Sequence, residues 1–183
     1  MCLIFLVFLH RTDLGLKKKK ENAMTYALIF GSLLLVAVIF IVVRDVVRHR
    51  RERKLIHEKI HDKQRRSYAF LINHDFEVVD TNYYELNPDV EKAPPYVLGN
   101  VLHCQTGTDC GKCGTGFACQ TCPVRYVINN AFRQKRAFEH VEAKMNLYDA
   151  VYKVHTVNVE LNGEPVFFKN EPHMLVTAKT LKT

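Results

Sequence analysis

Five of the six cysteines of this chain lie in one segment rich in glycine and threonine, HCQTGTDCGKCGTGFACQTC, residues 103–122. Within it, Cys110 and Cys113 form a Cys-x2-Cys pair, and Cys119 and Cys122 form a second pair after five intervening residues. Such a pair can present two sulfurs to one metal because the tight turn points both inward, and the neighbouring glycines let the backbone wrap. Four thiolates suit tetrahedral zinc or an iron–sulfur cluster.

The segment by itself leaves open which residues bind and whether they bind at all. His103 and Cys104 are additional candidate ligands beside the two pairs. The alternative is a flexible loop of free thiols that form disulfides reversibly, in which a helix beginning just after Cys122 would favour its thiolate. The candidate metal-ligating residues are therefore Cys104, Cys110, Cys113, Cys119 and Cys122.

A second pattern with chemical potential is HEKIH, residues 57–61, which matches the HExxH motif of zinc proteases. On a helix, His57 and His61 would share one face and Glu58 could serve as a base. However, Lys59 and Asp62 place charges where such a catalytic helix is normally apolar, and no downstream segment clearly offers a third ligand. We therefore interpret the match as fortuitous and expect no enzyme, with a membrane zinc protease as the less favoured alternative.

The longest apolar run, YALIFGSLLLVAVIFIVV, covers residues 26–43 and contains no charged residue. At ~1.5 Å per residue its 18 residues reach about 27 Å, close to the ~30 Å hydrocarbon core of a bilayer. A cleaved signal peptide would have a shorter apolar stretch that ends in small residues. The sequence thus predicts a transmembrane helix over residues 24–43. Because Met24 directly precedes the run, we interpret residues 1–23 as an extension that an over-extended gene model would explain.

The net charge of +7 comes mainly from the basic stretch that follows the apolar run, residues 44–66. No base-stacking motif accompanies this charge, so we expect a juxtamembrane helix and no nucleic-acid partner. The richer positive flank predicts a single-pass protein of the cell inner membrane with a cytoplasmic C-terminal part. In that reducing compartment, clustered thiols favour metal or redox chemistry over structural disulfides. Regular heptads are missing, yet we expect a homodimer.

The remaining pattern, from Ser67 onward, alternates short apolar strands with helices. Pro123 suits the first position of a helix that carries Val124, Val127, Ile128 and Ala131 on one face. Asn162-Gly163 is a strong hairpin signal between the last two strands. The predicted strands are residues 68–73, 77–80, 138–145, 149–161 and 166–177, with a short helix starting within 82–86.

This order resembles the PAS family over roughly residues 67–181, within a predicted PAS-like domain of residues 67–183. AFLINHDFEVVDTN is similar to the opening PAS hairpin, VLGN to the entry into the central helical region, and CPVRYVINNAF to the long helix across the sheet. The resemblance implies an α+β fold, a five-stranded antiparallel sheet with helices on one face, preceded here by the transmembrane and juxtamembrane helices. It also implies sensing or protein interaction rather than catalysis.

The resemblance implies a ligand set of its own. Some bacterial PAS domains have a cysteine soon after the glycine of the VLGN-like segment and a Cys-x2-Cys-Pro before the long helix, which correspond to Cys104, Cys119 and Cys122. Cys113 would be the fourth ligand, and Cys110 a spare or resolving thiol. This set and the two Cys-x2-Cys pairs both remain open. An iron–sulfur cluster is favoured over zinc, because zinc has no redox chemistry with which a sensor could signal.

Other cofactors have no support in the sequence. A CxxCH motif for haem attachment is absent, and flavin pockets leave no short motif. We therefore expect a membrane-anchored PAS sensory module that responds to redox state, oxygen or metal and acts through a separate signalling protein such as a kinase or regulator. The alternative is a PAS adaptor for protein interaction, with structural zinc or free thiols.

Overall fold

The computed structural model describes residues 2–62, 67–149 and 151–181, with side chains from Phe30 onward. The chain divides into two compact units, Met1–Arg48 and His49–Thr183, which we describe separately. The described residues of the first, from Cys2 onward, are helical, and the second contains the sheet and all of the candidate site residues.

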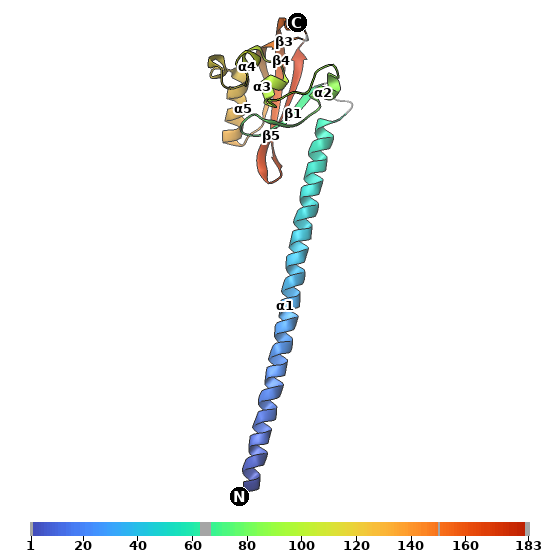
Figure 1. Cartoon of the computed structure of the whole chain (residues 1–183), viewed down its shortest axis with the longest axis vertical. Helices are drawn as coiled ribbons and strands as arrows, with labels where there is room; N and C mark the ends of the chain where they lie inside the picture. The colour runs from blue at the N-terminus through green and yellow to red at the C-terminus, as the bar shows by residue number, and fades with distance from the viewer. Residues whose placement is uncertain (1, 63–66, 150, 182–183) are drawn as a thin grey trace. The chain divides into compact units, whose positions relative to one another are not determined.

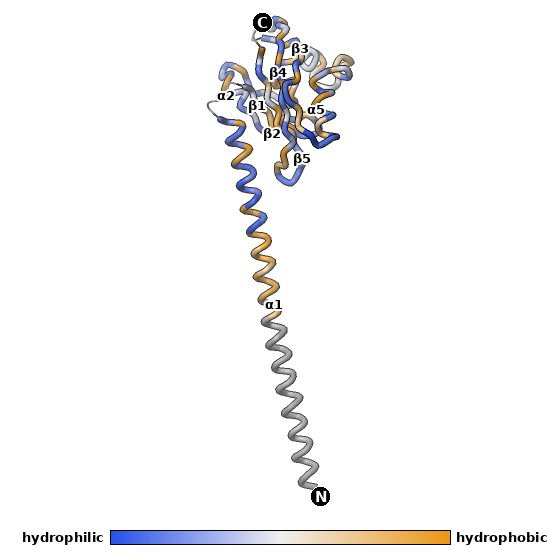
Figure 2. The backbone as a smooth tube through the Cα atoms, turned by 180° about the vertical axis from the view of Figure 1, so that it is seen from behind, coloured by the Kyte–Doolittle hydropathy of each residue, from blue (hydrophilic) through white to orange (hydrophobic). Residues whose placement is uncertain are grey.

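Helix α1 (Cys2–Ile60) contains the apolar run (Figures 1 and 2). Its part from Phe30 to Ile60 has a mean hydropathy of 2.4 over its most apolar 18 residues, and none of that window is buried in protein. By length and composition this helix could cross a membrane. It ends at Ile60, earlier than the predicted residue 66, and residues 63–66 lie outside the described parts of the chain.

The second unit is built on a five-stranded antiparallel sheet with the order β2-β1-β5-β4-β3 (Figure 1). The α+β class and the antiparallel five-stranded sheet are therefore confirmed. The first two strands fall within about one residue of their predicted positions, whereas the last two are displaced along the chain. The strands are β1 (Tyr68–Ile72), β2 (Val78–Thr81), β3 (Phe138–Tyr148), β4 (Val154–Phe168) and β5 (Glu171–Leu181).

The predicted hairpin turn at Asn162-Gly163 is wrong. Strand β4 continues through both residues, and Gly163 pairs with Val176 of β5. The turn lies instead at Lys169-Asn170, where both residues have positive φ, as the two-residue hairpin turns with matching twist require. Gly163 serves packing: a Cβ there would lie 2.1 Å from the Phe138 ring, so only glycine leaves room for this aromatic side chain.

The main core fills one face of the sheet, under short helices and one longer helix. Alternate residues of β1 and β5, among them Phe70 and Val176, are buried there against Ile128 of the longer helix. Pro123 stands at the first position of that helix, as predicted. The helical elements are α2 (Tyr83–Leu86), α3 (Leu98–Val101), α4 (Gln105–Asp109), the 3-10 turn η1 (Phe117–Cys119) and α5 (Pro123–Gln134).

The opposite face of the sheet carries a smaller apolar cluster. Ile56 and Ile60, in the last turns of α1, pack there with Ala69, Leu71 and Leu175. Ile60 is completely buried, and burial of such a side chain is worth roughly 1.5–3 kcal/mol. The expectation of helices on one face was therefore incomplete, because the end of α1 covers part of the other face.

Candidate functional site

The five clustered cysteines are all free thiols, four of them at the ends of short elements and one in a turn. Cys104 and Cys110 cap the two ends of α4, Cys119 closes η1, and Cys122 caps the start of α5. Cys113 lies in the turn between α4 and η1. The segment 103–122 therefore folds as a chain of caps and turns, which brings residues distant along it together.

Four of these cysteines share one location, and we call Cys104, Cys113, Cys119 and Cys122 the thiol group. A Cβ on Gly99 would lie 2.5 Å from the Cys113 sulfur and 3.6 Å from the Cys104 Cβ, so both residues flank this glycine. Cys104 interacts electrostatically with Cys119 and Cys122, and Cys113 interacts with Cys119. Cys113 and Cys122 also pack against the main core.

Cys110 is set apart from the thiol group. It is exposed, and its sulfur lies 2.7 Å from the point where a Cβ on Gly116 would stand. The thiol group therefore has the same four members as the ligand set implied by the PAS resemblance. It includes only three of the four cysteines of the two Cys-x2-Cys pairs, because Cys110 lies outside it.

The sulfurs of the thiol group are more widely spaced than a single zinc ion requires. Zinc–sulfur bonds of ~2.3 Å in a tetrahedron would place the sulfurs about 3.8 Å apart. Among the described residues, the one set of three or more potential ligand atoms within 4.8 Å of one another contains no cysteine. In an iron–sulfur cluster each cysteine sulfur can bind a different iron, so the cysteine sulfurs lie further apart than they do around one zinc ion.

Burial and nearby hydrogen-bond donors act in opposite directions on the thiol group. Burial raises the pKa of the Cys104 thiol, although the backbone N–H groups of Gly107 and Thr106 donate to its sulfur and lower the pKa. Burial also raises the pKa of the Cys113 thiol, against hydrogen bonding and charge from Arg125. Without a metal, both groups therefore favour the protonated form.

Arg125 was not anticipated from the sequence. Its Nη1 lies 3.8 Å from the Cys113 sulfur, and its guanidinium stands over the Phe76 ring, 4.0 Å from the ring centroid. This arrangement fixes one positive charge beside the thiol group. A basic residue one turn after the Cys-Pro pair was the only available signal, and it was obscured by the many other Lys and Arg residues.

Asn100 was also missed, although it lies within the quoted VLGN. Its side-chain amide donates to the carbonyls of Gly107 and Gly111, and its Oδ1 accepts from the backbone N–H of Cys113 at 2.7 Å. This side chain therefore ties α3 to α4 and to the turn that carries Cys113. His103, an initial ligand candidate, has a left-handed backbone (φ 54°) and its carbonyl accepts from the Tyr148 N–H at 2.8 Å, which anchors the segment to β3.

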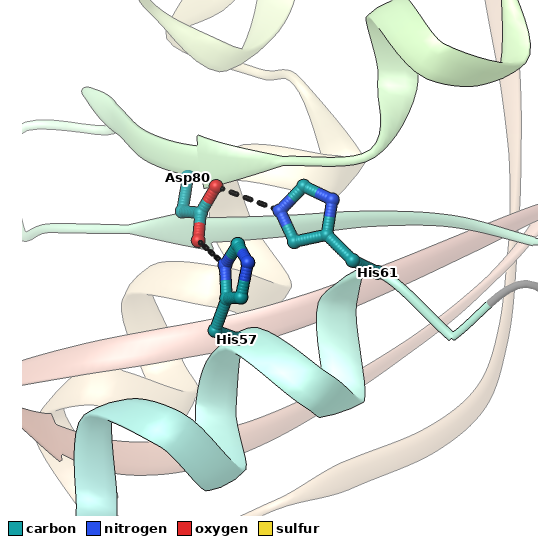
Figure 3. Close-up of side chains that lie close together, drawn as sticks. All are labelled: His57, His61 and Asp80. Carbon is teal, nitrogen blue, oxygen red and sulfur yellow. Dashed lines mark hydrogen bonds and ion pairs between the residues drawn. The ribbon is translucent and has the colours of Figure 1, made fainter.

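The histidine motif occupies a different part of the second unit. His57 and His61 both face Asp80 of β2, as Figure 3 shows. The sequence offered no clear third ligand, but the structure brings the Asp80 carboxylate, 19 residues beyond His61, to both imidazoles as a candidate third ligand. Glu58 lines a groove with Val166 and Phe167.

The unit thus has two groupings of metal-ligating side chains, one of thiols and one of imidazoles with a carboxylate. Comparisons with known proteins assign neither grouping to a family. No protein-family model matches the chain, and no curated protein or solved structure matches it.

Proposed function

We propose that this protein is a membrane-anchored sensory module of the PAS type, in which the thiol group binds an iron–sulfur cluster and the state of that centre is passed to a separate signalling protein. The single observation that carries the proposal is the convergence of four free cysteines from separate caps and turns beside the main core.

The side chains of the thiol group fit such a centre in their chemistry. Cys104, Cys113, Cys119 and Cys122 would hold it, with the N–H donors around Cys104 and the Arg125 guanidinium offsetting thiolate charge. When bound, a cluster supplies one-electron redox chemistry or sensitivity to oxygen. The wide spacing of the sulfurs also favours a multi-iron centre over one zinc ion.

The position of the thiol group supports signalling from it to the sheet. Cys122 is the N-cap of α5, and the buried face of α5, including Ile128 and Phe132, packs on the main core. A change in ligation at Cys122 would therefore alter the start of a helix that packs on the sheet core. Close-packed cores transmit such shifts because they deform little.

The proposed location follows from α1 and its flanks. The helix could cross a membrane, and its C-terminal flank carries the basic residues that favour the cytoplasmic side. We therefore place the second unit in the cytoplasm, where a cluster could form and a kinase or regulator could be contacted. A C-terminal reporter that is active only outside the cytoplasm would contradict this orientation.

The test is to purify the full chain in detergent without oxygen and to measure iron, acid-labile sulfide and zinc. We expect coloured protein that contains iron and sulfide and bleaches in air. Cys119→Ser combined with Cys122→Ser should abolish the colour, whereas Cys110→Ser, the matched control in the same segment, should retain it.

Two results would overturn the proposal. Colourless protein with stoichiometric zinc in the thiol group would support the adaptor with a structural metal. Protein with neither metal, whose folding is unchanged by the double serine substitution, would leave only reversible thiol chemistry.

A further inference from the structure

His57, His61 and Asp80, which we call the histidine–aspartate cluster, join α1 to β2 within the second unit (Figure 3). The two histidines stand one helical turn apart, with ring centroids separated by 4.2 Å. Their nitrogens approach the two oxygens of one carboxylate: His61 Nε2 lies 3.1 Å from Oδ1 and His57 Nδ1 lies 3.3 Å from Oδ2.

These separations match the ligand spacing around a small divalent cation. Zinc–nitrogen and zinc–oxygen bonds of ~2.0–2.2 Å in a tetrahedron place adjacent ligand atoms about 3.3–3.6 Å apart. The three potential ligand atoms all lie within 4.8 Å of one another. The two nitrogen–oxygen separations are close to this spacing, and side-chain adjustments of about an ångström would let one cation be bound by all three residues.

A second carboxylate orients His61. Its Nδ1 lies 2.7 Å from Oε1 of Glu85 in α2, while its Nε2 faces Asp80. A carboxylate in this position accepts the Nδ1 proton and directs the Nε2 lone pair at the metal, the arrangement found behind metal-binding histidines. With that proton on Nδ1, the electron pairs of Nε2 and of the Asp80 oxygen face each other, and a cation between them removes the repulsion.

Exposure and donor type define the class of cation. The exposed fraction of the side chain is 19% for His61, 30% for Asp80 and 64% for His57, so water can reach a fourth position. Two imidazole nitrogens exclude calcium and magnesium as preferred occupants and suit zinc and its transition-metal neighbours. Hydrolysis would require Glu58 to act as a base on water at the cation. Glu58 instead lines a groove with Val166 and Phe167 that contains none of the three cluster residues, so the geometry favours cation binding without hydrolysis.

We propose that the histidine–aspartate cluster binds a zinc-class divalent cation that fastens the last turns of α1 to β2. Two ligands come from the helix that continues out of the apolar run and one comes from the sheet, so the cation links the two elements directly. Binding adds to the packing of Ile60 on the sheet and reduces fraying of the helix end.

The experiment titrates Co²⁺ into the full chain in detergent, under reducing conditions without oxygen, and then displaces it with Zn²⁺. Cobalt bound to nitrogen and oxygen gives ligand-field absorption without the sulfur-to-cobalt charge-transfer band, which separates this site from the thiol group. We expect one equivalent of Co²⁺ to add this thiolate-free signal in the unmodified chain without increasing any charge-transfer band that the thiol group gives, and we expect slower amide exchange over residues 49–60 when zinc is bound.

His57→Ala and Asp80→Asn should each weaken binding more than about tenfold, and Glu85→Gln should weaken it by about 10–100-fold. His57 is mostly exposed, so its substitution should leave the fold intact, as circular dichroism will show. The matched control is His140→Ala. His140 is also exposed and its Nδ1 lies 2.9 Å from a Glu160 carboxylate oxygen, but among the described residues it belongs to no set of three potential metal ligands.

Absence of a thiolate-free signal in the unmodified chain, or an equal signal in His57→Ala, would overturn the proposal and leave the cluster as an ion-pair contact. The result is independent of the proposed function. Cys119→Ser with Cys122→Ser should leave the thiolate-free signal unchanged, and His57→Ala should leave the iron and sulfide content unchanged.

Discussion

The thiol group and the histidine–aspartate cluster are assembled in opposite ways. The thiol group comes from one continuous stretch of 20 residues, folded into caps and turns, and its members are mostly buried or half-buried. The histidine–aspartate cluster joins the end of a helix to a strand of the sheet, 19 to 23 residues further along the chain, and His57 is largely open to solvent. A local site is visible in residue spacing, whereas a site across elements depends on how those elements pack.

The two sites also neighbour different cores. The thiol group packs beside the main core under α5, whereas Asp80 pairs with Leu71, a residue of the smaller cluster beneath the end of α1. The sheet therefore separates them, and each should respond to substitutions in its own core. The predictions below test this separation, beginning with the largest expected effect.

Ile60→Ala should damage the histidine–aspartate cluster and spare the thiol group. Truncation of this completely buried side chain should lower the free energy of unfolding by about 2–5 kcal/mol. Cobalt binding at the cluster should weaken with it, because His57 and His61 lie on the same helical turns. Leu55→Ala is the control: this side chain is 60% exposed, and its loss should change stability by about 0.5 kcal/mol or less. Denaturant unfolding followed by circular dichroism measures both, and equal losses would contradict the packing of α1 on the sheet.

Gly99→Ala should damage the thiol group and spare the histidine–aspartate cluster. Its Cβ would lie 2.5 Å from the Cys113 sulfur and 2.8 Å from the Cys113 Cβ, so the turn that carries Cys113 must move. Overpacking of this kind costs about 1–3 kcal/mol, and iron content after anaerobic purification should fall while the cobalt signal at the histidine–aspartate cluster persists. Gly31→Ala is the control, since a Cβ there meets nothing within 4 Å. Unchanged iron content in Gly99→Ala would refute the placement of Cys113.

In metal-free, reduced protein, pH should distinguish buried from exposed thiols. Burial raises the pKa of the Cys104 and Cys113 thiols, so at pH near 8 they should be alkylated more slowly than exposed Cys110. The folded state then retains protons that the unfolded state releases. The stability from these two groups is therefore fully present below the ordinary thiol pKa of 9.0 and is lost as pH rises through the raised folded values. Mass spectrometry of alkylated peptides measures the rates, and faster labelling of Cys113 than Cys110 would contradict the burial.

Lys59→Ala should give the smallest effect. Its Nζ lies 3.0 Å from a Glu164 carboxylate oxygen, but the side chains are 49% and 54% exposed, so the pair is screened. We expect a loss of roughly 0–1 kcal/mol that shrinks further in high salt. Iron content at the thiol group and cobalt binding at the histidine–aspartate cluster should both stay unchanged. A loss above about 2 kcal/mol would show that this ion pair contributes to the docking of α1 as strongly as the buried isoleucine does.

The sequence alone determined the features that depend on local patterns. An uncharged apolar run specifies a helix able to cross a membrane, and Pro123 after Cys122 specifies the start of α5. Alternation of apolar residues located the first three strands closely and displaced the last two, and the grouping of thiols identified the segment to examine. The Asn162-Gly163 prediction failed because the same glycine that suits a turn also leaves room for the Phe138 ring in a strand.

Only the tertiary structure decided which side chains meet. It separated Cys110 from the thiol group, because the cap positions of α4 direct Cys104 and Cys110 to different neighbours. It brought Arg125 to Cys113, 12 residues away, and Asp80 to His61, 19 residues away, although no pattern in the sequence linked these positions. The physical reason is that the end of α1 reaches β2 only because Ile56 and Ile60 pack on the sheet. Such packing depends on the shapes of both surfaces and not on either sequence segment alone.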